Sequence, residues 1–234
     1  MLELQELHAY YGRSHIVQGI SLRVEAGEGV GLVGHNGVGK TTTLKAIMGL
    51  GPRTRGRITF EDRELRGPAY RRARLGIGYV PDAEAVFPDM TVEENIRAAA
   101  MVQPRGDQRR CLEMAYELFP LLSARRRQFA GTLSGGEQKA LNLARGLALE
   151  PRLLLVDEPS EGLMPRNVGL IATALRKAVG QGLAVLVVDA SFDLLKKVCT
   201  RLYVMKQGRI TGTHGLDAFP SADRLVAAYL KGEG

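Results

Sequence analysis

The chain has 234 residues, of which 45% are hydrophobic, and a formal net charge of +7. This length supplies one substantial hydrophobic core and is too short for two full domains with a linker. The longest apolar runs, "RLLLV" and "GLAVLVV", fall well short of the roughly 18 residues of a membrane-spanning helix, and both end at Asp, so we interpret them as buried strands. The opening residues lack the basic start and apolar stretch of a secretory signal.

Cysteine content and charge narrow the class of protein further. The two cysteines, Cys111 and Cys199, give no disulfide framework and are typical of a reducing cytoplasm. The basic runs "RRAR" (71–74) and "RRR" (125–127) favour solvated faces, with contact to an anionic membrane or to nucleic acid as the alternatives. Aromatic residues are few and not interleaved with these runs, so we expect no nucleic-acid partner.

The first third of the chain predicts short strands around one helix. "LELQEL" alternates as a strand does, and "GISLRVEAGEGVGLVG" predicts a hairpin that runs into a buried strand ending at Gly34. A helix is predicted from about Gly39 and stops near Gly49. "RITFED" and "GIGYVPD" predict two further strands, the second broken by Pro81.

The middle of the chain predicts helices. Thr91 and Glu94 fit a capping box that opens the helix "VEENIRAAAMV". A second helix is predicted from about Asp107 to Phe119. A third begins at a further S-x-x-E box in "LSGGEQ" and shows helical spacing until Pro151.

After Pro151, strand and helix patterns alternate. "RLLLVDE" is followed by a helix over about 165–180, then "GLAVLVVD", a helix started by Ser191, a terminal hairpin "RLYVMKQGRITGTH" and a closing helix "SADRLVAAYL". This alternation predicts parallel βαβ units, whose ligands gather at the carboxyl ends of the strands. We therefore predict an α/β fold, with residues 1–234 as one domain that has a helical insertion at roughly 90–145.

The stretch "GHNGVGKT", Gly34 to Thr41, fits the phosphate-loop pattern G-x-x-x-x-G-K-[ST] (Walker A) between a predicted strand and a predicted helix. Its glycines let the backbone wrap closely and point N–H groups inward, and the helix amino end adds partial positive charge. Lys40 would reach the β- and γ-phosphates, and the Thr41 hydroxyl would bind Mg²⁺. The nucleotide-binding residues expected here are Gly34, His35, Asn36, Gly37, Val38, Gly39, Lys40, Thr41 and Thr42.

A metal-bound triphosphate also needs carboxylates. "LLLVDE" places Asp157 and Glu158 at the end of an apolar strand, where ligands of such sheets collect. We expect Asp157 to hold Mg²⁺ through water, and Glu158 to orient or deprotonate the attacking water. Without the phosphate loop, an acidic pair at a strand end would indicate a helix cap or a loop charge.

A second loop, "LSGGEQ", offers a hydroxyl, bare backbone and a helix start, but no lysine and no metal ligand. Such a loop can touch a γ-phosphate that is held elsewhere and would hold one poorly by itself. The alternative for Ser134 and Glu137 is an ordinary capped helix.

The order "GHNGVGKT", "LSGGEQ", "LLLVDEP" resembles the ATP-binding subunit of ABC transporters, and the resemblance covers nearly the whole chain. It implies an ABC-type P-loop NTPase fold with a parallel-sheet core, an N-terminal antiparallel β subdomain and a helical subdomain. It implies ATP and Mg²⁺ as cofactors, transmembrane permease subunits as partners, and a place at the cytoplasmic face of a bacterial or archaeal membrane. In this family two ATP-binding subunits, of the same or different chains, meet head to tail. Ser134, Gly135, Gly136 and Glu137 would then contact the partner's nucleotide.

Other positions match the family more loosely. Tyr11, just before Gly12, corresponds to the aromatic residue that stacks on adenine, although a lone tyrosine also fits a core or a turn. "YVPDAEAVFPDMTVEEN" resembles the loop that links the γ-phosphate to the membrane subunit. That stretch and "VDEPSEGLMP" are closest to the branch that imports branched-chain amino acids, with urea and related amides as cousins.

Two positions depart from the family. Most members have Gln, as metal ligand and γ-phosphate sensor, and the branch that this chain resembles often has Glu, where this chain has Asp82. Asp keeps an oxygen for Mg²⁺ or water but is one methylene shorter than Glu and adds negative charge. Most members also have His, and the amino-acid branch often Gln, where this chain has Ala190, whose methyl group donates no hydrogen bond. Loss of one such donor costs roughly 10²–10³ in rate, so we expect ATP binding to survive and hydrolysis at this site to be slow. Asp189 or Ser191 would substitute if the turn were shifted by one residue.

Three functions remain open from the sequence. The first is an ATP-hydrolysing subunit of a membrane importer, and the second is an ATP-binding, weakly hydrolysing half of an asymmetric dimer that supports its partner's site. The third is a soluble ATPase that acts on DNA or ribosomes, which the absence of long coiled coils and of tandem ATPase units disfavours.

Overall fold

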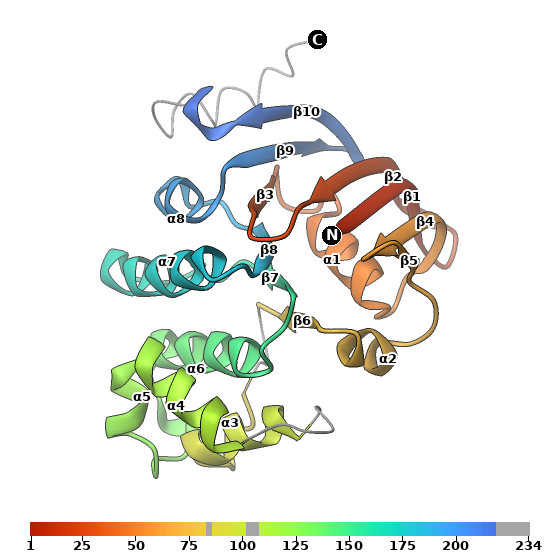
Figure 1. Ribbon diagram of the computed structural model, residues 1–234. Coiled ribbons are helices and arrows are strands. Elements are labelled where there is room, and N and C mark those ends of the chain that lie inside the picture. Colours follow the sequence, from red (N-terminus) through yellow and green to blue (C-terminus); the bar gives the residue numbers. More distant parts are fainter. Residues whose placement is uncertain (83–85, 102–107, 219–234) are drawn as a thin grey trace.

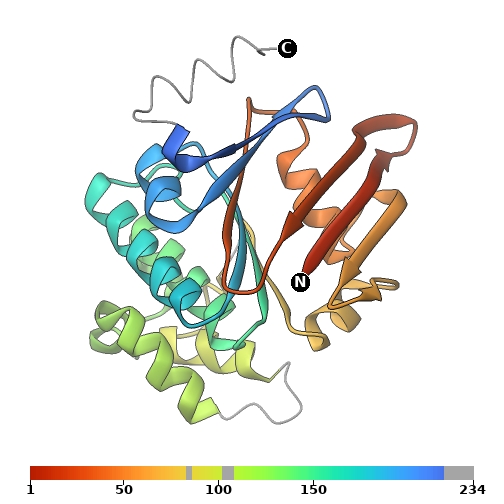
Figure 2. The same ribbon diagram turned by 45° about the horizontal axis from the view of Figure 1, so that its top comes forward.

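Two β-sheets share one hydrophobic core with a short helix, α1 (Lys40–Met48), in the computed structural model, which describes residues 1–82, 86–101 and 108–218 (Figures 1 and 2). The smaller sheet is antiparallel in the order β2-β1-β4-β5. Its strands are β1 (Leu2–Tyr11), β2 (Ser14–Val24), β4 (Arg53–Phe60) and β5 (Arg63–Glu64). The N-terminal antiparallel part expected from the family resemblance is confirmed.

The hairpin predicted around "EAGE" is wrong. β2 pairs with β1, through a tight turn in which Tyr11 is opposite Ser14, and not with the strand that follows it. Gly12 in that turn has φ 56°, a left-handed conformation that glycine adopts without strain. The "EAGE" segment instead crosses to the second sheet, where the Gly27 N–H donates to Gly182 O at 3.0 Å.

The larger sheet has the order β10-β9-β3-β8-β7-β6, parallel except for β10 at its edge. Its central strands are buried on both faces, which is why they read as continuous apolar runs. Leu153 and Leu155 of β7 face the core shared with the smaller sheet, whereas Leu154 and Val156 face a second core beneath the large helices. The strands are β3 (Gly29–Val33), β6 (Ile77–Val80), β7 (Leu153–Asp157), β8 (Ala184–Val188), β9 (Arg201–Lys206) and β10 (Arg209–Gly215).

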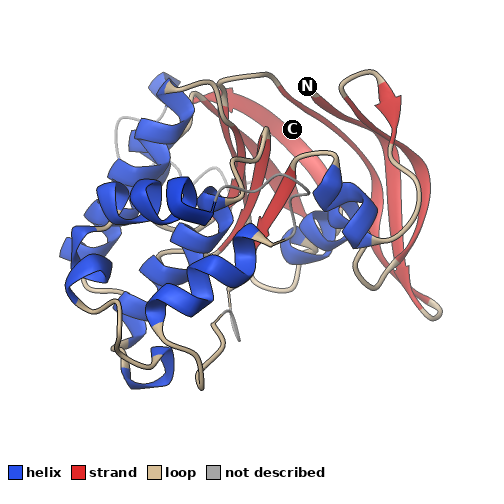
Figure 3. Cartoon of the chain, turned by 60° about the horizontal axis from the view of Figure 1, so that its bottom comes forward, coloured by secondary structure: helices blue, strands red, loops and turns tan. Residues whose placement is uncertain are grey.

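The helices from α3 to α8 cover the face of the large sheet that lies away from the small one, and in Figure 3 they form the large group on one side of the molecule, whereas α1 and α2 pack in the core shared with the small sheet. Both predicted capping boxes are present, at the starts of α3 and α6. The predicted closing helix lies outside the described residues. None of the helices in the described ranges is long and apolar enough to cross a membrane. Besides α1, the helices are α2 (Ala69–Arg74), α3 (Val92–Ala100), α4 (Gln108–Leu118), α5 (Pro120–Ala124), α6 (Gly135–Ala148), α7 (Pro165–Gly180) and α8 (Phe192–Val198), with 3₁₀ turns at Ala130–Thr132 and Leu216–Ala218.

The basic run 71–74 is only partly a solvated face. Arg72 is buried, and its guanidinium donates to Ala46 O at 2.9 Å and Ile47 O at 2.6 Å, two carbonyls at the carboxyl end of α1. Burial lowers the pKa of Arg72. One arginine of this run therefore caps the helix that begins at the phosphate loop, and the prediction of a fully solvated run is wrong at this residue.

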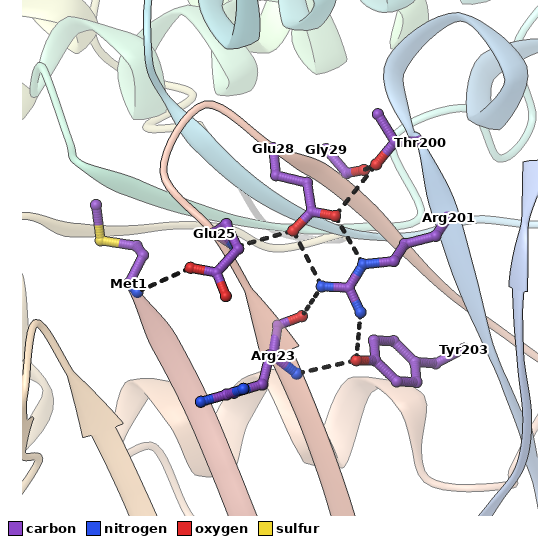
Figure 4. A network of polar contacts seen from close by, with 8 residues as sticks. All are labelled: Met1, Arg23, Glu25, Glu28, Gly29, Thr200, Arg201 and Tyr203. Atoms are coloured by element: carbon purple, nitrogen blue, oxygen red, sulfur yellow. Dashed lines mark hydrogen bonds and ion pairs between the residues drawn. The ribbon is translucent and has the colours of Figure 1, made fainter.

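A polar network ties the two sheets together where the chain crosses from β2 to β3 (Figure 4). Arg201 of β9 makes a bidentate ion pair with Glu28 at 2.7 and 3.0 Å, and it also donates to Arg23 O at 2.8 Å. The Tyr203 hydroxyl accepts the Arg23 N–H at 3.1 Å. Burial of Glu28 acts to raise its pKa, but the Arg201 hydrogen bonds and the Glu25 N–H outweigh burial and lower it.

We predict that Glu28→Gln lowers the free energy of unfolding at neutral pH by about 1–3 kcal/mol, because it breaks a partly buried, charge-assisted pair. A carboxylate with a lowered folded-state pKa stabilises above its ordinary value of 4.5 and loses that contribution as the pH falls below it. Urea unfolding at several pH values should therefore show the variant and the wild type converging below about pH 4.5. Glu25→Gln is the matched control, since Glu25 is 64% exposed where it pairs with the amino terminus; an equal loss in both variants would contradict the prediction.

Candidate functional site

The phosphate loop connects the buried strand β3 to α1, as predicted. Gly34, with φ 153°, lies so close to β9 that an added Cβ would be 2.2 Å from Met205 O. Gly39, with φ 111°, is the N-cap of α1 and packs against the Met205 side chain. Any side chain at these two positions would push the loop away from β9, which explains why glycine stands at both.

Lys40 is the buried cation of this loop, with 7% of its surface exposed. Its Nζ donates to Gly34 O at 2.9 Å and His35 O at 3.0 Å, and it stands 3.9 Å from Glu158 Oε1. A hollow of about 150 Å³ lies beside it. The lining residues are Ile16, Asn36, Gly37, Gly39, Lys40, Thr41, Thr42 and Glu158.

Asp157 joins the loop to the rest of the sheet edge. Its side chain is 2% exposed and accepts one hydrogen bond from Thr41 Oγ1 at 3.0 Å and another from the Tyr79 hydroxyl at 3.2 Å. Burial raises the pKa of Asp157, although the two hydrogen bonds act to lower it. Burial and the negative charge of Asp157 both raise the pKa of Tyr79. Tyr79 was not predicted; the only sequence signal for it is its alternating position on β6, the strand next to β7.

Glu158 follows Asp157 with φ 44°, and its N–H donates to Val188 O at 2.8 Å. This left-handed conformation at a non-glycine residue is strained and is held by the neighbouring strand. Burial and a hydrogen bond with Glu161 raise the pKa of Glu158 to about 7, while the Lys40 charge opposes this rise. Carboxylate oxygens of Asp82, Glu158 and Glu161 lie within 4.8 Å of one another. Glu161 was another residue that sequence reasoning missed.

Asp82, at the end of β6, pairs with Lys139 of α6 at an Oδ1–Nζ distance of 3.0 Å. The same ammonium donates to the backbone oxygen of Glu158 at 2.9 Å. Lys139 stands directly after "LSGGEQ" and was not singled out from the sequence. Lys139, on the helix that follows the second loop, therefore links Asp82 to Glu158 by contacting both residues.

The oxygen atoms at this edge suit a divalent cation. Thr41 supplies a hydroxyl and Asp157 a carboxylate that are already in contact, and Asp82 lies with its carboxylate oxygen within 4.8 Å of that of Glu158, the residue after Asp157. Hydroxyl and carboxylate oxygens are the hard ligands that Mg²⁺ prefers. The donor set fits the predicted metal residues Thr41, Asp82 and Asp157.

The second loop stands apart from this hollow. Ser134 caps α6, with its N–H donating to Glu137 Oε2 at 2.9 Å, and Ser134 and Gly135 are exposed. Gly136 packs on α7, where an added Cβ would be 2.3 Å from Asn167 Nδ2. Burial acts to raise the pKa of Glu137, but hydrogen bonds from Ser134 lower it. None of these residues lines the hollow beside Lys40.

Tyr11 also lies outside the hollow. It is 42% exposed at the end of β1, and its ring faces Gly51, where an added Cβ would be 3.4 Å from the ring. Ile16 of β2 lines the hollow beside Lys40 instead.

Ala190 is exposed directly after β8, and its neighbours are engaged elsewhere. Asp189 is 2% exposed and accepts from Ser160 Oγ at 2.5 Å and from the Ser160 and Ser191 N–H groups at 2.9 and 2.7 Å. Ser191 Oγ caps α8 by accepting the Leu194 N–H. These contacts do not support the expectation that Asp189 substitutes for the missing family side chain.

Comparison with known proteins agrees with this geometry. The ABC transporter family matches residues 17–161. The BraG protein of Pseudomonas aeruginosa, a high-affinity branched-chain amino acid transport ATP-binding protein, is 36% identical over 99% of this chain and 100% of its own length. The lipopolysaccharide export ATP-binding protein LptB of Escherichia coli is 35% identical over 96% of this chain and 94% of its own.

Solved structures agree as well. The ATP-binding subunit of an ABC transporter superposes with a TM-score of 0.84 at 26% identity, covering 98% of this chain and 99% of that one. A dimeric post-hydrolysis cassette with bound ADP and Pi superposes with a TM-score of 0.81 at 25% identity, covering 94% and 100%. The chain therefore belongs to the ABC transporter family, as an ATP-binding ATPase subunit with the ABC-type fold.

Proposed function

We propose that this chain drives a membrane importer by binding and hydrolysing Mg²⁺-ATP between itself and a second ATP-binding subunit. The observation that carries the proposal is the junction of Lys40, Thr41, Asp157 and Glu158 at the carboxyl edge of the large sheet. Residues 1–234 would work as one unit, with the part at roughly 90–145 as its helical subdomain.

Each residue at this edge has a distinct proposed role. Lys40 gives up its bonds to the loop carbonyls and holds the β- and γ-phosphates, while the loop N–H groups surround them. Thr41, Asp82 and Asp157 would hold Mg²⁺, which supplies charge neutralisation at the phosphates when bound. Glu158 orients the attacking water and accepts its proton, a role that suits a pKa of about 7. Tyr11 stacks on adenine.

The second subunit is needed because the loop Ser134–Glu137 faces outward. At the start of α6 the capping box engages the N–H groups of Ser134 and Glu137, which leaves the N–H groups of Gly135 and Gly136 as donors to a phosphate, but the chain's own hollow is elsewhere. A head-to-tail dimer would bring this loop onto the partner's ATP.

Permease subunits would dock over the helices that flank Asp82, at the cytoplasmic face of the membrane. Phe87 and Phe129 are 47% and 55% exposed, which is unusual for phenylalanine in a monomer's surface. A hollow of about 490 Å³ lies beside Phe129, lined also by Pro88, Asp89, Gly131 and Thr132. Residues 83–85 of the linking loop lie outside the described ranges.

For the cargo we propose branched-chain amino acids or related small amides. The relative BraG matches over its full length, and "VFPDMTVEEN" and "VDEPSEGLMP" resemble that branch. LptB is nearly as similar, so lipopolysaccharide is the competing cargo.

The cargo is tested in the native cell. We predict that deleting the gene lowers uptake of labelled leucine, isoleucine and valine severalfold, and that the wild-type chain restores uptake whereas Lys40→Ala does not, because Lys40 grips the phosphates. Labelled urea and a short amide are assayed in parallel. Unchanged uptake of all of them, with a defect in outer-membrane lipopolysaccharide instead, would contradict the import proposal.

Glu158→Gln tests the catalytic role. We predict that it lowers ATPase turnover roughly 10²–10⁴-fold while ATP still binds, because the amide keeps the size of the side chain but accepts no proton. In the wild type, kcat/KM should rise with pH through about 7, since the base acts only when deprotonated. Glu117→Gln, which removes an exposed carboxylate that pairs with Lys177 away from the site, is the matched control and should leave turnover unchanged. Two equally weak rates for wild type and Glu158→Gln would favour the second candidate function, a weakly hydrolysing half of an asymmetric dimer.

The observation that favours this second candidate is the exposed methyl of Ala190 beside an Asp189 that is already engaged. We predict that Ala190→His raises turnover about tenfold or more, because it restores a hydrogen-bond donor at the γ-phosphate. Steady-state phosphate release measures the effect, and Ala190→Leu controls for size. No gain from His over Leu would mean that another donor already serves this position.

A further inference from the structure

Lys139, in the second turn of α6, contacts two elements of the site at once. Its Nζ lies 3.0 Å from Asp82 Oδ1 and donates to Glu158 O at 2.9 Å. Asn142, three residues further along the same face of α6, donates to Pro81 O at 2.7 Å. One face of α6 therefore holds both the end of β6 and the end of β7.

The ion pair answers a local excess of negative charge. Oxygens of Asp82, Glu158 and Glu161 lie within 4.8 Å of one another, and carboxylates so close repel each other unless a cation or a shared proton offsets their charge. Lys40 stands 3.9 Å from Glu158, on the phosphate-loop side of this group. Lys139 provides the ammonium in direct contact with Asp82, and its side chain is only 20% exposed.

We propose that Lys139 is a positioning residue that competes with the divalent cation for Asp82. The inference rests on the proposed role of Asp82 as a cation ligand. A cation ligated by Asp82 would stand close to the Lys139 ammonium, and two positive charges beside one carboxylate repel each other, so the ion pair weakens the hold of Asp82 on the cation. Lys139 would keep its bond to Glu158 O while Asp82 turns towards the cation.

The pair with Asp82 is one of three contacts that hold α6, the helix capped by Ser134, against the ends of β6 and β7. The other two, from Asn142 to Pro81 O and from Lys139 to Glu158 O, do not involve Asp82. Release of Asp82 would therefore leave α6 and the loop Ser134–Glu137 in place, and the exchange is confined to the side chains of Lys139 and Asp82.

Mn²⁺ binding in the presence of a non-hydrolysable ATP analogue tests the competition without catalysis. Free Mn²⁺ is followed by electron paramagnetic resonance in wild type, Lys139→Gln and Lys139→Arg. We expect Lys139→Gln to bind Mn²⁺ roughly three- to fivefold more tightly, the worth of a partly exposed ion pair, because its amide still donates to Glu158 O but leaves Asp82 unpaired. Lys139→Arg, which keeps the charge, stays close to wild type, and circular dichroism checks folding.

The partner of Lys139 is identified by combining variants. In an Asp82→Asn background Lys139→Gln should give no gain in Mn²⁺ affinity, since the competition is gone. Lys177→Gln, which breaks a remote Lys–Glu pair with Glu117, should leave the affinity unchanged. An unchanged or weaker affinity in Lys139→Gln, or an equal gain in the Asp82→Asn background, would overturn the inference but not the proposed function. Loss of Mn²⁺–analogue binding by the wild type itself would overturn both.

Discussion

A buried carboxylate, Asp157, connects the phosphate loop to the sheet on which the site is built. It ends β7, accepts the Thr41 hydroxyl at the start of α1 and accepts the Tyr79 hydroxyl of β6. Asp157 is 2% exposed, and burying a carboxylate costs free energy unless its oxygens accept hydrogen bonds. The hydrogen bonds from Thr41 and Tyr79 therefore fix the positions of all three side chains. These two hydrogen bonds join α1, β6 and β7, and they thereby set how far Lys40 of the loop lies from the acidic residues that follow β6 and β7.

Strain at the next residue has the same origin. Glu158 has to leave the strand direction at once to face Lys40, and the left-handed φ of 44° accomplishes that turn. Three hydrogen bonds hold its backbone there: its own N–H donates to Val188 O, and its O accepts from the Lys139 ammonium and the Glu161 N–H. A strained backbone conformation persists only where several contacts hold it in place. A fixed position is what we expect of a residue whose proposed role is to orient one attacking water.

What the sequence predicted well was local. The phosphate loop, the acidic pair after β7 and the two capping boxes each lie within a few consecutive residues, so spacing alone identifies them. Contacts between distant residues were missed unless a family motif joined them, as for Thr41 and Asp157: Asp82 and Lys139 are 57 positions apart, and Tyr79 and Asp157 are 78 apart. The wrong hairpin has the same cause, because alternation in β2 is equally compatible with either neighbour and pairing is decided by the core it covers. The short helix α2 gave no apolar periodicity, since it is fixed by Arg72 capping α1.

The loop Ser134–Glu137 is prepared for a phosphate in an unexpected way. The Ser134 hydroxyl donates to Glu137 Oε2 at 2.9 Å, so its proton is already used inside the capping box. A phosphate approaching α6 therefore meets first the N–H groups of Gly135 and Gly136, which lie outside the capping box, while the Ser134 hydroxyl would have to exchange its partner. The carboxylate of Glu137 would repel that phosphate, but Arg125, 3.0 Å away, offsets its charge. The loop Ser134–Glu137, with the charge of Glu137 offset by Arg125, can contact a phosphate that the partner already binds. It has no equivalent of Lys40, the residue with which the first loop binds the phosphates of its own nucleotide.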